Sequence, residues 1–156
     1  MGRAPGAAVS YLSADDLVAR FGAAEIDELA PPNDPAARTA TIDAAIGDAC
    51  AEIDGVIAET YTLPLRAAAQ WPILVAIGAD LARARLYDAA APERVLGRLS
   101  AARNRLERIG TGELRLLDAS GVEADRHPTV MVDRGVAVAT RTALRGYLDP
   151  VLGSGR

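Results

Sequence analysis

Two carboxylates one helical turn apart are the first side chains in this 156-residue sequence whose spacing could support chemistry. Asp48 and Glu52 stand at i and i+4 in a segment with a helical pattern, so they would share one helix face and could hold a divalent cation together. The single histidine, His127, precedes Pro128 in a polar segment where we expect an exposed loop, and no matched third ligand accompanies the pair. The pattern favours a solvated acidic face. An enzyme that uses these two carboxylates is the distant alternative.

The other candidate reactive groups have structural explanations. Cys50 is the only cysteine, it has no histidine or basic cluster beside it, and we expect a small buried side chain. The run Gly110-Thr111-Gly112 lacks the lysine and hydroxyl residue of a P-loop, so it predicts the end of a helix. A single histidine in an expected loop is also weak support for a Ser-His-Asp triad. The sequence therefore predicts no catalytic residues, no cofactor and no metal site.

Arginines form the second charged pattern, and the chain contains no lysine. Four of them recur at helical spacing in one segment: Arg94, Arg98, Arg105 and Arg108. A net charge of -4 and the lack of interleaved aromatic residues disfavour binding to DNA. We expect the arginines to pair with an acidic surface in the same chain or on a neighbouring copy. The first candidates for that surface are Asp48, Glu52 and Glu59. A head-to-tail contact of this kind forms a ring if its rotation closes.

Helices are predicted to position these side chains. Half of the residues are hydrophobic but only 4% are aromatic, which favours closely packed helices. Two short helices are predicted within residues 11–22 and 23–30, and three longer ones over residues 41–61, 71–88 and 92–110. Thr41 is the expected N-cap of the first long helix, with a surface loop over residues 31–38 before it.

Details of the two following helices are also predicted. Gly78 is expected to let another helix approach closely, because glycine in an exposed helix interior is unfavourable. Asp80 and Arg83, three residues apart, are expected to pair on the helix surface. From Val95 to Ile109, apolar residues recur at alternating spacings of four and three, as in a coiled-coil seam.

The chain is predicted to divide into a flexible N-terminus (1–10), a helical domain (11–112), and a loop with an extended, partly β C-terminal arm (113–156). One short strand is expected at residues 113–117, and a β-prone stretch follows at 129–139. We expect the arm to dock on another protein, with a hairpin folded back on its own helices as the alternative. The expected docking residues are Val130, Val132, Val136, Val138, Leu144, Tyr147 and Leu148. No signal peptide pattern or membrane-span-length apolar run is present in this sequence, so we expect no membrane association.

A family resemblance is carried by the order of several motifs along the chain. YLSADDLVARFG precedes an acidic helix that contains AEIDG, then come YTLPL, DLARARLYD, PERV and LERIGTGE, and TRTALRGYLD follows in the tail. The residues that carry the likeness are 11–22, 42–55, 61–65, 80–87, 92–95 and 106–113. In this order the motifs resemble the Mu-like phage family of small virion proteins with the head-to-tail connector, or adaptor, fold.

The resemblance implies a structural, non-enzymatic virion protein. It implies a homo-oligomeric ring of about twelve copies in the neck between head and tail, made in the host cytoplasm. The implied partners are the portal protein and a stopper or tail-proximal neck protein, and DNA is only cargo that passes through the lumen. The alternative is a helical interaction or regulatory domain, encoded by a prophage, that binds one partner without forming a ring.

Overall fold

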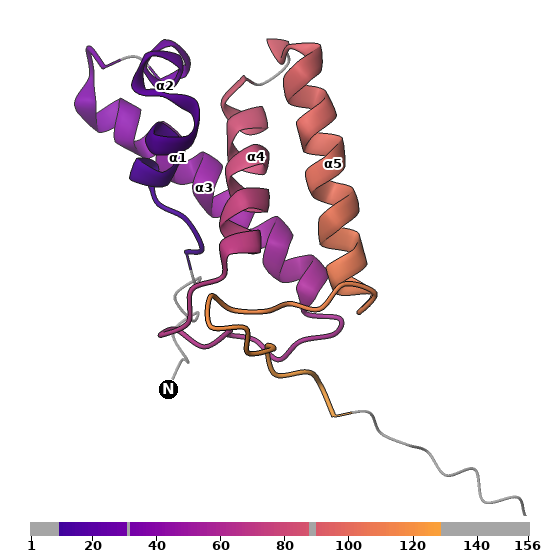
Figure 1. The fold of residues 1–156 in the computed structure, drawn as a ribbon. Helices are drawn as coiled ribbons and strands as arrows, with labels where there is room; N and C mark the ends of the chain where they lie inside the picture. Colours follow the sequence, from indigo (N-terminus) through magenta and orange to yellow (C-terminus); the bar gives the residue numbers. More distant parts are fainter. Residues whose placement is uncertain (1–9, 31, 88–89, 129–156) are drawn as a thin grey trace, which may run out of the picture.

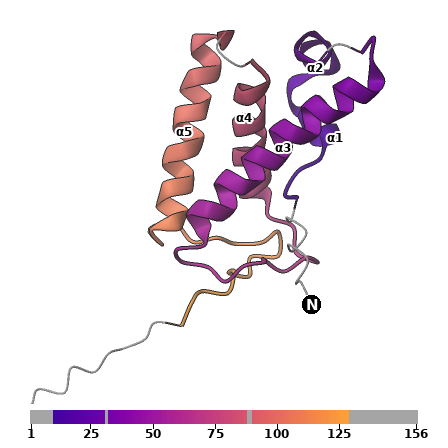
Figure 2. The ribbon, with the colours of Figure 1, turned by 180° about the vertical axis from the view of Figure 1, so that it is seen from behind.

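Five helices make up most of the computed structural model, which describes residues 10–30, 32–87 and 90–128. They are α1 (Ala14–Phe21), α2 (Ala23–Leu29), α3 (Pro35–Ile57), α4 (Pro72–Tyr87) and α5 (Glu93–Gly110). The predicted mainly α fold, with two short helices followed by three long ones, is confirmed. Helix α4 is central: it contacts α1, α3 and α5, and α3 crosses behind it in Figure 1 and in front of it in the reverse view of Figure 2.

The helix starts follow their capping residues. Ser13 and Asp16 form a capping box at α1. The prediction that Thr41 caps α3 is wrong, because the helix begins at Pro35 and the Asp34 carboxylate accepts hydrogen bonds from the backbone N–H groups of Ala36 and Ala37, both at 3.1 Å. Proline lacks the N–H that the first helical position leaves without an intrahelical partner, so Pro35 starts this helix instead of breaking it.

Close approach between helices depends on two glycines. A Cβ at Gly78 would lie 2.9 Å from the Leu12 side chain and 3.3 Å from that of Ile53, which confirms its expected close contact with another helix. A Cβ at Gly110 would lie 2.6 Å from the Val56 side chain and 2.9 Å from the Val56 carbonyl oxygen, so α5 ends directly against α3. Cys50 lies in the core between these contacts, buried as predicted.

Residues 113–128 pack against the helices, although the sequence pattern placed the end of the helical domain at residue 112. Leu116 and Ala124 are buried in the core, and the Tyr61 hydroxyl bonds the Leu116 backbone N–H at 3.0 Å. The strand expected at residues 113–117 is wrong: in the described chain this segment makes a single β-bridge, Leu117 to Glu123. The backbone N–H of Leu116 donates to the Tyr61 hydroxyl instead of to a partner strand.

Within the described residues, no helix is long and apolar enough to cross a membrane. The predicted C-terminal arm, with its docking residues from Val130 to Leu148, lies outside the described residues.

Candidate protein interaction surfaces

A buried ion pair ties α2 to α4. The Arg83 side chain is only 7% exposed, and its Nε and Nη2 donate to the two carboxylate oxygens of Glu25 at 2.7 and 2.9 Å. The Tyr87 hydroxyl donates to the same carboxylate at 2.7 Å, and the Arg83 guanidinium lies 4.4 Å from the centre of the Phe21 ring. The predicted surface pair of Asp80 and Arg83 is wrong, because Arg83 faces α2, where a buried guanidinium needs a bidentate partner.

The charges around this pair keep Glu25 ionised. Burial acts to raise its pKa, but the hydrogen bonds from Tyr87 and Arg83 and the positive charges of Arg83 and Arg94 outweigh it, so the pKa of Glu25 is lowered. The hydrogen bond to Glu25 raises the pKa of Tyr87. A carboxylate held in this way contributes to stability and is poorly suited to exchange protons.

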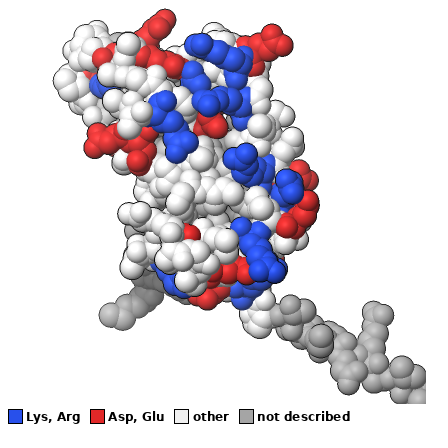
Figure 3. Space-filling view, in the orientation of Figure 1, with Lys and Arg blue, Asp and Glu red and all other residues white. Residues whose placement is uncertain are grey.

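An arginine cleft lies directly outside the buried pair, with a volume of about 470 Å³. Its lining residues come from α1, α2, α4 and α5: Arg20, Phe21, Glu25, Arg83, Arg94 and Arg98. Arg98 is 60% exposed and 3.8 Å from Asp80, whereas Arg20 and Arg94 form no ion pair within the described chain. Figure 3 shows arginines gathered over the upper parts of α4 and α5 and along α5. The cleft therefore carries more positive than negative charge.

The exposed face of α3 has the opposite character. Its centre consists of small residues: Ala44, Gly47, Ala51, Gly55 and Ala58. At 3.6 residues per turn, Asp43 borders this face on one side and Asp48 and Glu59 border it on the other. A Cβ at Gly47 or Gly55 would have nothing within 4 Å, so no described part of the chain covers the face. The result is a smooth helix surface with carboxylates along both edges, which we call the acidic α3 face.

A third charged cluster joins α3, α4 and α5. Glu52 accepts from Arg85 Nη2 at 2.5 Å and from Arg103 Nε at 2.8 Å, and Asp48 lies 3.9 Å from Arg85. The hydrogen bond from Arg103 is the main cause of the lowered pKa of Glu52, although burial opposes it. No group of three or more metal-binding side chains occurs in residues 10–30, 32–87 and 90–128. Glu52 is thus occupied by arginines of its own chain.

The remaining predicted interface residues are spread over the surface. Arg105 and Glu59 are exposed, and Arg108 pairs with Glu113 at 3.0 Å. His127 is exposed as expected, and its Nε2 lies 2.9 Å from the Ala58 carbonyl oxygen. The sequence patterns missed the arginines that α1, α4 and α5 bring to the two charged clusters: Arg20, Arg83, Arg85 and Arg103. Which acidic residues lie near these arginines depends on how the helices pack, and the spacing of residues along the sequence does not show this.

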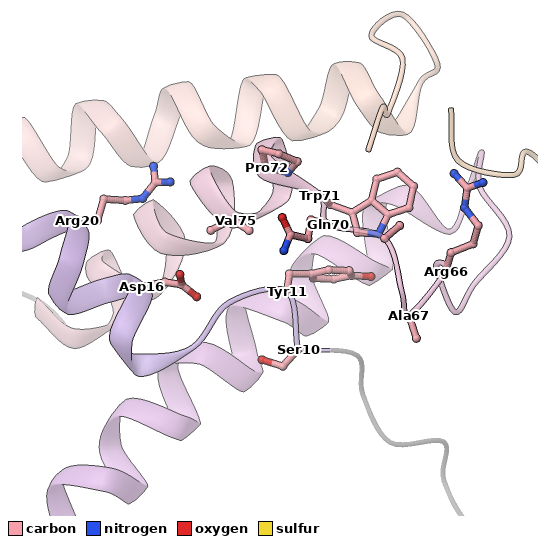
Figure 4. A pocket seen from close by; sticks show the side chains of 11 residues that line it. Ser10, Tyr11, Asp16, Arg20, Arg66, Ala67, Gln70, Trp71, Pro72 and Val75 are labelled. Atoms are coloured by element: carbon pink, nitrogen blue, oxygen red, sulfur yellow. The ribbon is translucent and has the colours of Figure 1, made fainter. Parts of the chain in front are cut away.

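Another hollow, with a volume of about 480 Å³, lies between the N-terminal segment and the start of α4. Figure 4 shows Tyr11 and Trp71 on its walls, together with Asp16. Burial is the main cause of the raised pKa of Tyr11, and the hydrogen bond that its hydroxyl donates to Asp54 is the second cause. Asp16 accepts the Ser13 N–H of the capping box, the main reason for its lowered pKa. These hydrogen bonds hold the N-terminal segment against α3 and cap the start of α1.

The fold and its charged surfaces define a small α-helical domain whose prominent exposed features suit contacts with other proteins. The protein-family model described as "Bacteriophage Mu, Gp36" matches residues 11–133, and the chain belongs to this family. The Mu-like phage origin indicated by the sequence resemblance is thereby confirmed. No curated protein matches the sequence.

Proposed function

We propose that this chain is a structural virion protein, a head-to-tail connector adaptor that forms a ring on the portal of a Mu-like phage. Its family membership and the order of its sequence motifs support a virion role. The chain acts as a scaffold without enzymatic activity, and its other partner is a stopper or tail-proximal neck protein. Phage DNA passes through the ring as cargo, and the net charge of -4 limits its retention on the protein.

The observation that carries the ring is the placement of opposite charges on opposite faces. Arginines gather over the upper parts of α4 and α5 on the face seen in Figure 3, whereas α3, with four carboxylates and one arginine, crosses the reverse face in Figure 2. Arg85 and Arg103 are the exceptions, since they reach Glu52 on α3. Two different complementary surfaces on opposite faces favour a heterologous contact, which repeats from copy to copy and closes into a ring when its rotation allows.

Assembly is expected to need the portal. Exposed ion pairs give weak association by themselves, so the purified chain should be a monomer or small oligomer at micromolar concentration. The C-terminal arm, residues 129–148, supplies the portal contact in this proposal. Truncation after Pro128 should therefore abolish portal binding while the helical body stays folded. Portal binding that survives the truncation would place the docking surface elsewhere.

The decisive experiment is deletion of the gene in the phage or prophage that encodes it. The expected result is DNA-filled heads without attached tails in electron micrographs, with tails restored by the wild-type gene supplied in trans. Labelling of the complementing protein should locate it at the neck. Tailed particles that form normally without the protein would contradict the proposal.

The alternative, a prophage regulatory or interaction domain that forms no ring, makes a different prediction. Light scattering coupled to size-exclusion chromatography would then show a complex with one partner protein and no large assembly with the portal. If the chain is the adaptor, the same measurement on its mixture with the portal should instead show a particle much heavier than the portal alone.

A further inference from the structure

The arginine cleft has positive charge that the described residues of its own chain do not balance. Arg83 is already neutralised by Glu25, which holds it through two hydrogen bonds. Arg20, Arg94 and Arg98 remain, and the nearest carboxylate to Arg98 is Asp80 at 3.8 Å. Guanidinium groups that converge on one hollow suit carboxylates, because each can donate two parallel hydrogen bonds. The cleft therefore fits an acidic partner surface.

The acidic α3 face has the complementary charge and only small side chains at its centre. Among the described residues nothing lies against Gly47 or Gly55, and glycine in an exposed helix interior costs about 1 kcal/mol relative to alanine, so packing within the described chain gives no reason for them. A face of alanine and glycine allows another surface to approach the helix backbone closely. Asp43 and Asp48 border the face on opposite sides and are about 7.5 Å apart along the helix, while Arg94 and Arg98 are about 6 Å apart.

We propose that the arginine cleft of one copy receives the acidic α3 face of the next copy, with Asp43 and Asp48 placed against Arg20, Arg94 and Arg98. This inference rests on the proposed ring, since it names the contact between neighbouring subunits. Of the four α5 arginines, only Arg94 and Arg98 take part in this contact. Arg108 is paired with Glu113, and Arg105 does not line the cleft. Arg83 and Glu25 form the floor of the contact, and Glu52 stays with Arg85 and Arg103.

Charge exchange between two variants tests the contact. The first variant is Arg94→Glu with Arg98→Glu, and the second is Asp43→Arg with Asp48→Arg. Sedimentation equilibrium at low ionic strength, up to about 1 mM protein, should show weak self-association of the wild type. Each variant alone should associate at least about tenfold more weakly, because like charges then meet at every contact. An equimolar mixture should recover wild-type association, since every contact between unlike copies is complementary again.

The matched control is Arg105→Glu with Arg115→Glu, which makes the same change in net charge outside the cleft. It should associate like the wild type, and circular dichroism should show that all variants are folded. A wild type that stays monomeric at about 1 mM, a mixture that does not recover, or a control as weak as the cleft variant would each overturn the proposal. Binding of a short DNA duplex that the cleft variant loses, with self-association unchanged, would also overturn it.

Failure of this contact and failure of the proposed function have different signatures. If the chain associates through the cleft but is missing from purified particles, the contact stands and the connector role fails. If the Arg94→Glu, Arg98→Glu variant enters particles at wild-type levels, the connector role stands and the contact fails.

Discussion

Two carboxylates in this protein are each held by arginine, but in different surroundings. Glu25 is bound by Arg83, whose side chain is 7% exposed, at the junction of α2 and α4. Glu52 is bound by Arg85 and Arg103, whose side chains are 34% and 56% exposed, where α3, α4 and α5 meet. Both carboxylates have lowered pKa values. The chemistry is the same, and the difference lies in how much water reaches the guanidinium groups.

This difference separates a stabilising contact from a surface network. A pair that has lost its water is sensitive to the loss of one partner, because the other charge is left buried and uncompensated. An exposed pair is screened by solvent and salt, so its loss changes stability little. The number of ion pairs around a carboxylate is therefore a poor guide to its energetic weight: Glu52 has two arginines, but Glu25 holds the helices together more strongly.

Arg83→Met should have the largest effect. Removal of the buried guanidinium leaves the Glu25 carboxylate at the α2–α4 junction without its charged partner, and we expect a loss of about 3 kcal/mol in the free energy of unfolding. The measurement is urea denaturation followed by circular dichroism.

The matched control is Arg85→Met, two residues along the same helix. It removes one of two exposed partners of Glu52, and we expect a change of at most about 1 kcal/mol. Equal losses in the two variants would show that burial does not decide the weight of these pairs.

The pH dependence of stability should distinguish the same two carboxylates. Both have pKa values below the ordinary 4.5 in the folded chain, so the unfolded chain binds more protons in acid. Their stabilising contribution is complete above pH 4.5 and is lost as the pH falls through the lowered folded values. Glu25→Gln and Glu52→Gln should each flatten the acid limb of the stability curve.

Salt should separate the two variants. In about 1 M salt the difference between Glu52→Gln and wild type should shrink, while that of Glu25→Gln persists, because buried pairs are screened less. The measurement is urea denaturation as a function of pH at two salt concentrations. Equal salt sensitivity of the two carboxylates would argue against the assigned burial.

The number, order and type of the helices are predictable because apolar residues recur at helical spacing in α1, α3 and α5 and because Pro72 and Pro92 mark the starts of α4 and α5. The sequence pattern misplaced the start of α3, since Pro35 was interpreted as part of a loop, although proline is favourable at a first helical position. It also missed that Arg83 faces inward. Helix α4 has apolar residues on nearly every side, so the 3.6-residue period does not reveal which side faces α2.

The charged surfaces were predicted in part. The spacing of the α5 arginines predicts a common face, and two of the four, Arg94 and Arg98, line one cleft. The intrachain partners of Glu52 were not predictable, because Arg85 and Arg103 reach it from two other helices across more than thirty residues of sequence. Such pairings depend on how the helices pack, which local spacing does not specify.

Tyr87→Phe tests the buried cluster more gently than Arg83→Met. The Tyr87 hydroxyl donates to Glu25 at 2.7 Å, and its removal leaves the Arg83 contacts in place. We expect a loss of about 1 kcal/mol, in the range for a hydrogen bond to a charged group at a partly exposed site. A double-mutant cycle with Glu25→Gln should give a clear coupling energy, because the two side chains are in contact. Additive effects would show that the hydroxyl does not act through the carboxylate.

Arg103→Met should have the smallest effect and is the strictest test of the comparison. Its Nε donates to Glu52 at 2.8 Å and its Nη2 at 3.4 Å, so one of its two hydrogen bonds is nearly as short as those of the buried pair, yet 56% of the side chain is exposed. If geometry alone decided, the loss would approach that of Arg83→Met. If burial decides, Arg85 and water take over the Glu52 oxygens, and the loss is a few tenths of a kcal/mol. Urea denaturation at low and high salt gives the answer: a loss near that of Arg83→Met, unchanged by salt, would mean that the α3–α5 contact depends on this ion pair.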